Sequence, residues 1–146
     1  AVDAEIDAAR ADAAGKVAIA MQYEGDVGTS VPLAAIHRRG GALAFLRAPD
    51  AEERRLRHYL GSIAFDGTGR TIVATSPRGS VAAIWDGARG TYLDMEEASD
   101  GCGVAATDDG FVVAGGDGRL RRIAEGTNRP IATTDWMWDN HLIALG

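Results

Sequence analysis

The sequence lacks most of the residues on which disulfide frameworks, sulfur-bound metal sites and membrane spans depend. It has one cysteine, Cys102, which excludes an intrachain disulfide and a cysteine-rich zinc site. No apolar run approaches the roughly 18 residues that a spanning helix needs, so we predict no transmembrane segment. Acidic residues outnumber basic ones by 21 to 15, and the net charge of −6 argues against nucleic acid as a partner. Gly-x-Ser-x-Gly, Walker and His-Glu-x-x-His motifs are also missing from the sequence.

Glycine, in contrast, is abundant, and the sequence repeats itself. There are 19 glycines, and they separate short runs of apolar and β-branched residues. The segment 61–97 has the pattern of four strands with tight turns, and this pattern recurs in 102–135 and in 1–48. Four strands in roughly 40 residues are typical of a β-propeller blade. A two-sheet sandwich would not need the internal similarity and is the less favoured alternative.

Both ends are expected to interrupt the repeat. Residues 1–3 align with 64–66, the end of an innermost strand, and 138–145 aligns with the start of such a strand. Closed propellers have roughly 4–8 blades. We therefore expect an all-β fold, a β-propeller fragment that forms the C-terminal part of one domain. It would comprise about three four-stranded antiparallel blades and a closing strand at 138–145, the innermost strand of another blade.

Two segments are predicted to be insertions. Residues 5–14 are expected to form a long loop or a short helix where the other copies have a tight turn. Residues 50–60 are predicted to form a helical insertion, in which Asp50 caps the N-terminus and Glu53 completes a capping box. Leu56, Tyr59 and Leu60 share one face of that helix.

Several unusual runs resemble the C-terminal half of the domain-of-unknown-function family 1513. They are MQYEG at 21–25, HRRGG at 37–41, SPRG at 76–79, DGCGV at 100–104 and WDNHL at 138–142. The resemblance implies a seven-bladed β-propeller that is exported to the bacterial periplasm through a twin-arginine signal. Genes of this family often lie beside genes for iron-regulated proteins, which implies protein partners in an iron-acquisition system. The family supplies no established catalytic residues.

The candidate site residues lie where the innermost strands begin, because propellers bind ligands at the mouth of the central channel. His141 and Asp139 are candidate metal ligands, since imidazole and carboxylate bind iron, zinc or copper. Asn140, Cys102 and Ser62 occupy further mouth positions. The alternative for this group is structural: capping of strand ends and close packing between strands. Among the tryptophans, Trp85 is expected to pack between blades, whereas Trp136 and Trp138 are candidates for a binding surface.

We therefore predict a non-enzymatic periplasmic propeller that acts as a binding or scaffold protein, associated with bacterial iron uptake. One alternative is a metal-binding or redox-linked protein or enzyme, with its site at the channel mouth and a metal ion as cofactor. A further alternative is a cytoplasmic interaction module of the WD type, to which the Trp85-Asp86 pair at a strand end corresponds.

Overall fold

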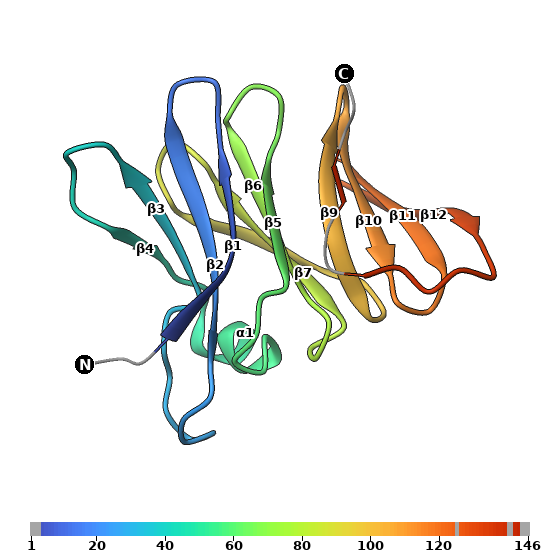
Figure 1. Ribbon diagram of the computed structural model, residues 1–146, viewed down its shortest axis with the longest axis horizontal. Coiled ribbons are helices and arrows are strands. Elements are labelled where there is room, and N and C mark those ends of the chain that lie inside the picture. Colours follow the sequence, from blue (N-terminus) through green and yellow to red (C-terminus); the bar gives the residue numbers. More distant parts are fainter. Residues whose placement is uncertain (1–3, 125, 140–141, 144–146) are drawn as a thin grey trace.

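The computed structural model describes residues 4–124, 126–139 and 142–143. These residues form three four-stranded antiparallel sheets and one short helix (Figure 1). The elements are β1 (Ala4–Ala11), β2 (Lys16–Tyr23), β3 (Ala34–Arg38), β4 (Ala44–Leu46), α1 (Asp50–Arg55), β5 (Ser62–Phe65), β6 (Thr71–Ser76), β7 (Val81–Asp86), β8 (Tyr92–Glu97), β9 (Gly101–Thr107), β10 (Gly110–Gly115), β11 (Arg119–Ala124) and β12 (Thr127–Thr133). No helix among the described residues is long and apolar enough to cross a membrane.

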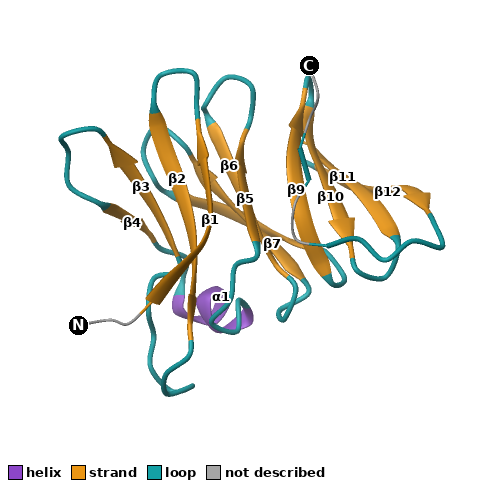
Figure 2. Cartoon of the chain, in the orientation of Figure 1, coloured by secondary structure: helices purple, strands orange, loops and turns teal. Residues whose placement is uncertain are grey.

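Each sheet is a meander in which consecutive strands are neighbours. We name the sheets blade 1 (β1–β4), blade 2 (β5–β8) and blade 3 (β9–β12). The blades stand side by side, with β1 next to β5 and β5 next to β9, while α1 lies below blades 1 and 2 in this view (Figure 2). This arrangement confirms the prediction of three four-stranded antiparallel blades.

Blade 2 is buried on both faces, because the other two blades pack against it. Its strand β6 has the sequence TIVATS, in which every residue after the first is buried. Since successive side chains of a strand point to opposite faces, Ile72 and Ala74 join the core shared with blade 1, and Val73 joins the core shared with blade 3. Trp85 is 1 % exposed and donates its indole N–H to the Arg47 carbonyl at 3.2 Å. This contact spans blades 1 and 2, as predicted for Trp85.

The innermost strands approach one another closely, and small residues permit that approach. Equivalent ladder positions on β1, β5 and β9 hold Ala8, Ser62 and Gly103, which pair with Ala20, Thr75 and Ala114 respectively. Between blades 2 and 3 the strands are also linked by hydrogen bonds. The Val104 N–H donates to the Ser62 hydroxyl at 3.2 Å, and the Thr75 hydroxyl donates to the Cys102 carbonyl at 2.8 Å.

The prediction of a loop or helix at 5–14 is wrong, because most of this segment is strand β1. It pairs with β2 from Ala4–Tyr23 to Ala11–Val17. A tight turn follows, in which the Asp12 carboxylate accepts the N–H groups of Ala14 and Lys16. Asp66 accepts the N–H groups of Thr68 and Arg70 in the same way. Asp12, rather than a residue of 1–3, is therefore the counterpart of Asp66, and blade 1 has four strands.

The helix predicted within 50–60 is shorter than expected and begins differently. It ends at Arg55, after which the chain turns and Tyr59 makes a single bridge to Gln22. Pro49 is the N-cap residue, and no side chain caps the first turn. The Glu53 carboxylate does reach back, as in a capping box, but it accepts the Ala48 N–H at 3.1 Å. Proline at the cap has no side-chain oxygen, so the cap that we predicted for Asp50 does not form.

Candidate functional site

Ser62, the first channel-mouth candidate, is part of the packing between strands. It is fully buried, and its hydroxyl accepts the backbone N–H of Val104 on the adjacent innermost strand. A buried donor without a partner costs about 1–3 kcal/mol. The hydroxyl of Ser62 therefore holds blade 3 against blade 2.

Cys102 lies at the start of β9 and is 8 % exposed. Its thiol donates to the Asp100 carbonyl at 3.1 Å. Burial raises the pKa of the thiol, and the negative charges of Asp100, Asp139 and Asp117 raise it further, although a backbone hydrogen bond from Gly116 acts in the opposite direction. Because the thiolate is the nucleophile and the metal ligand, this environment disfavours nucleophilic and metal-binding roles for Cys102.

The closing segment contains the metal-site candidates. Asp139 is exposed, whereas Asn140 and His141 lie outside the described residues. Within the described part of the chain, no group of three or more His, Cys, Asp or Glu side chains is placed to hold a metal ion. The metal site at His141 and Asp139 therefore stays a prediction.

The described residues of the segment 138–145 do not form the regular strand that was predicted there. Trp138, Asp139, Leu142 and Ile143 are outside the regular strands. The segment nevertheless lies beside β9, because a Cβ placed on Gly103 would be 3.0 Å from the backbone N of Leu142. Val104 lies beside Ser62 in the corresponding way, through its N–H bond to the Ser62 hydroxyl. Leu142 therefore lies beside β9 in the way that Val104 of β9 lies beside β5.

The tryptophans that follow β12 differ from each other. Trp136 is 74 % exposed and is followed by Met137, which is 87 % exposed. Trp138 is half-buried. Trp136 and Met137 thus form a small exposed apolar surface, at one of the two positions where a tryptophan surface was expected.

One hollow in the structure was not identified from the sequence. It is a groove of about 1090 Å³ between blades 2 and 3, at the end of the blades where β5 turns into β6 and β9 turns into β10. Apolar residues of both blades line it, and they are Val73, Ile84, Leu93, Ala106, Phe111, Ile123 and Ala124. Leu93 on β8 is 54 % exposed, so part of this apolar surface faces solvent.

Carboxylates line the same groove, and they are Asp66, Asp94, Glu96, Asp108 and Asp109. None of the described lining residues is a lysine or an arginine. Desolvation on its own raises the pKa of Asp66, but hydrogen bonds from the Arg70 backbone and from Thr68 and Thr71 outweigh it and hold the pKa below its ordinary value. Asp66 is therefore ionised at neutral pH, and the charged residues in the described lining of the groove are all acidic.

Two of the carboxylates already have partners at the rim. Glu96 accepts the Asn128 amide at 2.9 Å, which links β8 to β12 across the outer end of the groove. Asp109 forms an ion pair with Arg122. Asp66, Asp94 and Asp108 have no ion pair among the described residues. The groove can therefore accept a positively charged group that also has an apolar portion.

Comparison with protein families places these features in context. A family model described as "Protein of unknown function (DUF1513)" matches residues 6–145. The chain belongs to the DUF1513 family. The match covers all three blades and confirms the resemblance seen in the sequence. No curated protein matches this DUF1513 chain.

Among solved structures, the DUF1513 chain is similar to one titled "Crystal Structure Of The C-Terminal WD40 Domain Of Sif2". The TM-score is 0.61 at 16 % sequence identity, and the match covers 89 % of this chain. It covers 34 % of the Sif2 chain, so the DUF1513 chain spans about a third of that structure. At this identity the likeness shows the fold, which is that of β-propeller blades.

Proposed function

We propose that this chain belongs to a non-enzymatic β-propeller that binds a partner protein. The groove between blades 2 and 3 carries the proposal, because it combines exposed apolar surface with carboxylates that lack ion-pair partners. Interaction sites on proteins combine apolar contact area with charges that complement the partner. A WD40-like fold supports the same class of function.

The cellular setting is part of the proposal. The family resemblance supports a periplasmic protein with a twin-arginine signal, associated with bacterial iron uptake, and protein partners from that system. The three blades and the partial coverage of the Sif2 structure support the assignment of this chain to part of a larger ring. Sequencing of the DNA immediately upstream of the region that encodes this chain tests for the twin-arginine signal. Fractionation of the cells tests the location, and a protein that stays in the cytoplasm would contradict it.

Site-specific photo-crosslinking tests the binding function. A photoreactive amino acid at Leu93 lies in the groove, whereas one at Val27, an apolar residue 88 % exposed in the β2–β3 loop, lies outside it. We expect a discrete adduct, identified by mass spectrometry, from Leu93 and none from Val27. Identical adducts from both positions would contradict a docking role for the groove.

A further inference from the structure

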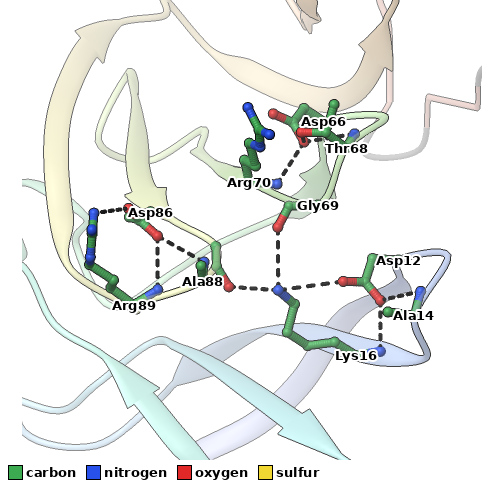
Figure 3. A network of polar contacts seen from close by, with 11 residues as sticks. Asp12, Ala14, Lys16, Asp66, Thr68, Gly69, Arg70, Asp86, Ala88 and Arg89 are labelled. Carbon is green, nitrogen blue, oxygen red and sulfur yellow. Dashed lines mark hydrogen bonds and ion pairs between the residues drawn. The ribbon is translucent and has the colours of Figure 1, made fainter.

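At the interface between blades 1 and 2, a lysine side chain fills the space that corresponds to the groove between blades 2 and 3. Lys16, the first residue of β2, is 5 % exposed and extends from blade 1 toward blade 2. Its ammonium lies 3.4 Å from the Asp12 carboxylate and donates to the carbonyls of Gly87 at 2.6 Å and Gly69 at 3.3 Å (Figure 3). The ammonium is also 5.0 Å from the centre of the Phe65 ring. A carboxylate, two carbonyls and an aromatic face thus surround one buried cation.

The ladder identifies the residue that holds the place of Lys16 in blade 2. The carbonyl of Lys16 accepts the Asp12 N–H at 2.8 Å, and the carbonyl of Thr71 accepts the Asp66 N–H at 2.9 Å. Thr71 is therefore the counterpart of Lys16, as Asp66 is of Asp12. Arg70 follows Asp66 at the same spacing as Lys16 follows Asp12, but it is exposed.

The aromatic partner is replaced as well. Phe65 pairs with Ile72 at the end of β5, and Ala106 pairs with Phe111 at the equivalent place on β9. Between blades 2 and 3 a threonine and an alanine therefore stand where a lysine and a phenylalanine stand between blades 1 and 2. Both replacements are shorter, and both line the groove. The carboxylate of Asp66 remains in its wall.

We propose that the groove takes the ammonium of a lysine side chain from a partner protein, in the place that Lys16 occupies one interface earlier. The proposal rests on the proposed function, because the lysine belongs to the bound protein. Charge complementarity supports it: Asp66 is ionised, and the turn with Asp108 and Asp109 lies where the turn with Gly69 lies between blades 1 and 2. Apolar side chains of the wall that are at least partly exposed, including Ile84, Leu93 and Ala106, would contact the methylene groups of the lysine.

The proposal can be tested on the whole protein with a minimal probe, Nα-acetyl-lysine N-methylamide, by ligand-observed saturation-transfer NMR. We expect saturable binding through the ε-methylene, and none with the neutral Nε-acetylated probe. Asp66→Asn should weaken binding about tenfold or more, as expected for loss of a charge-assisted hydrogen bond. Thr71→Lys should abolish binding, because its own ammonium would occupy the groove, whereas the matched variant Thr71→Val should bind the probe as before.

Equal binding of the neutral probe, equal binding of the corresponding arginine probe, or full binding by Thr71→Lys would overturn the proposal. The outcomes also separate it from the proposed function. If the protein adduct at Leu93 persists in Thr71→Lys, the groove is a docking site for a protein but does not bind a lysine side chain. Probe binding without any protein adduct leaves a groove that binds ammonium groups and overturns the partner-protein function.

Discussion

Replacement of Lys16 by methionine should destabilise the protein by about 3–5 kcal/mol, the range found when one partner of a buried ion pair is removed. The side chains of Lys16 and Asp12 are 6 % and 8 % exposed, so the carboxylate that remains keeps its two backbone hydrogen bonds but has little access to water. The carbonyls of Gly69 and Gly87 lose a donor as well. Urea unfolding followed by tryptophan fluorescence measures the loss, with Trp85 as a buried reporter at the same interface.

Asp12→Asn is the matched partner of this variant, because its side-chain oxygen can still accept the turn N–H groups of Ala14 and Lys16. The double variant should recover part of the stability lost in Lys16→Met, since it contains no buried uncompensated charge. A loss below about 1 kcal/mol, as for an exposed ion pair, or strictly additive single effects, would refute the assignment of a buried bridge between blades.

The pH dependence follows from the same carboxyl group. Desolvation alone raises the pKa of Asp12, but hydrogen bonds from the backbone and side chain of Lys16, together with its charge, hold that pKa below the ordinary value of 3.8. The stabilising contribution of Asp12 is therefore present above that ordinary value and lost as the pH falls through the lowered one. The difference in stability between the wild type and Lys16→Met should shrink over this acidic range.

Two further substitutions test the packing between elements. Gly79→Ala should destabilise the protein by about 1–3 kcal/mol in urea unfolding, because the new Cβ would lie 2.1 Å from the Arg55 carbonyl oxygen at the end of α1. Gly67→Ala is the control and should be close to neutral, because the space around its Cβ is open. Ser62→Ala should lose about 1–3 kcal/mol, because the buried Val104 N–H keeps no partner; an unchanged melting temperature would show that this bond does not link blades 2 and 3.

The repeat was predictable from the sequence because its turns have distinctive residues. Asp and Gly recur between short apolar runs, and they tolerate the backbone conformations that tight turns need. The strand β1 was missed because its sequence, AEIDAARA, contains one β-branched residue and several helix formers. Its pairing with β2 overrides that local preference. The Asp-x-x-Gly-Lys run at 12–16, which parallels Asp-x-x-Gly-Arg at 66–70, was the signal that could have placed it.

The groove was less accessible to prediction, because its walls come from two blades. Thr71 and Ala106 are ordinary strand residues when considered alone. Their significance depends on the ladder register, which aligns Thr71 with Lys16 and Ala106 with Phe65. For the mouth candidates the sequence shows only the residue types, whereas their hydrogen bonds depend on the fold. The Ser62 hydroxyl accepts the Val104 N–H of the next blade, and the Cys102 thiol donates to the carbonyl of Asp100, just before β9.

The most direct test of the lysine site in the groove is photo-crosslinking at Leu93 in two backgrounds, Thr71→Lys and Thr71→Val. Both substitutions change the same residue, and only lysine places an ammonium in the groove. We expect the partner adduct to form in Thr71→Val and to disappear in Thr71→Lys. An adduct of equal yield in both backgrounds would contradict the account of how this propeller binds its partner.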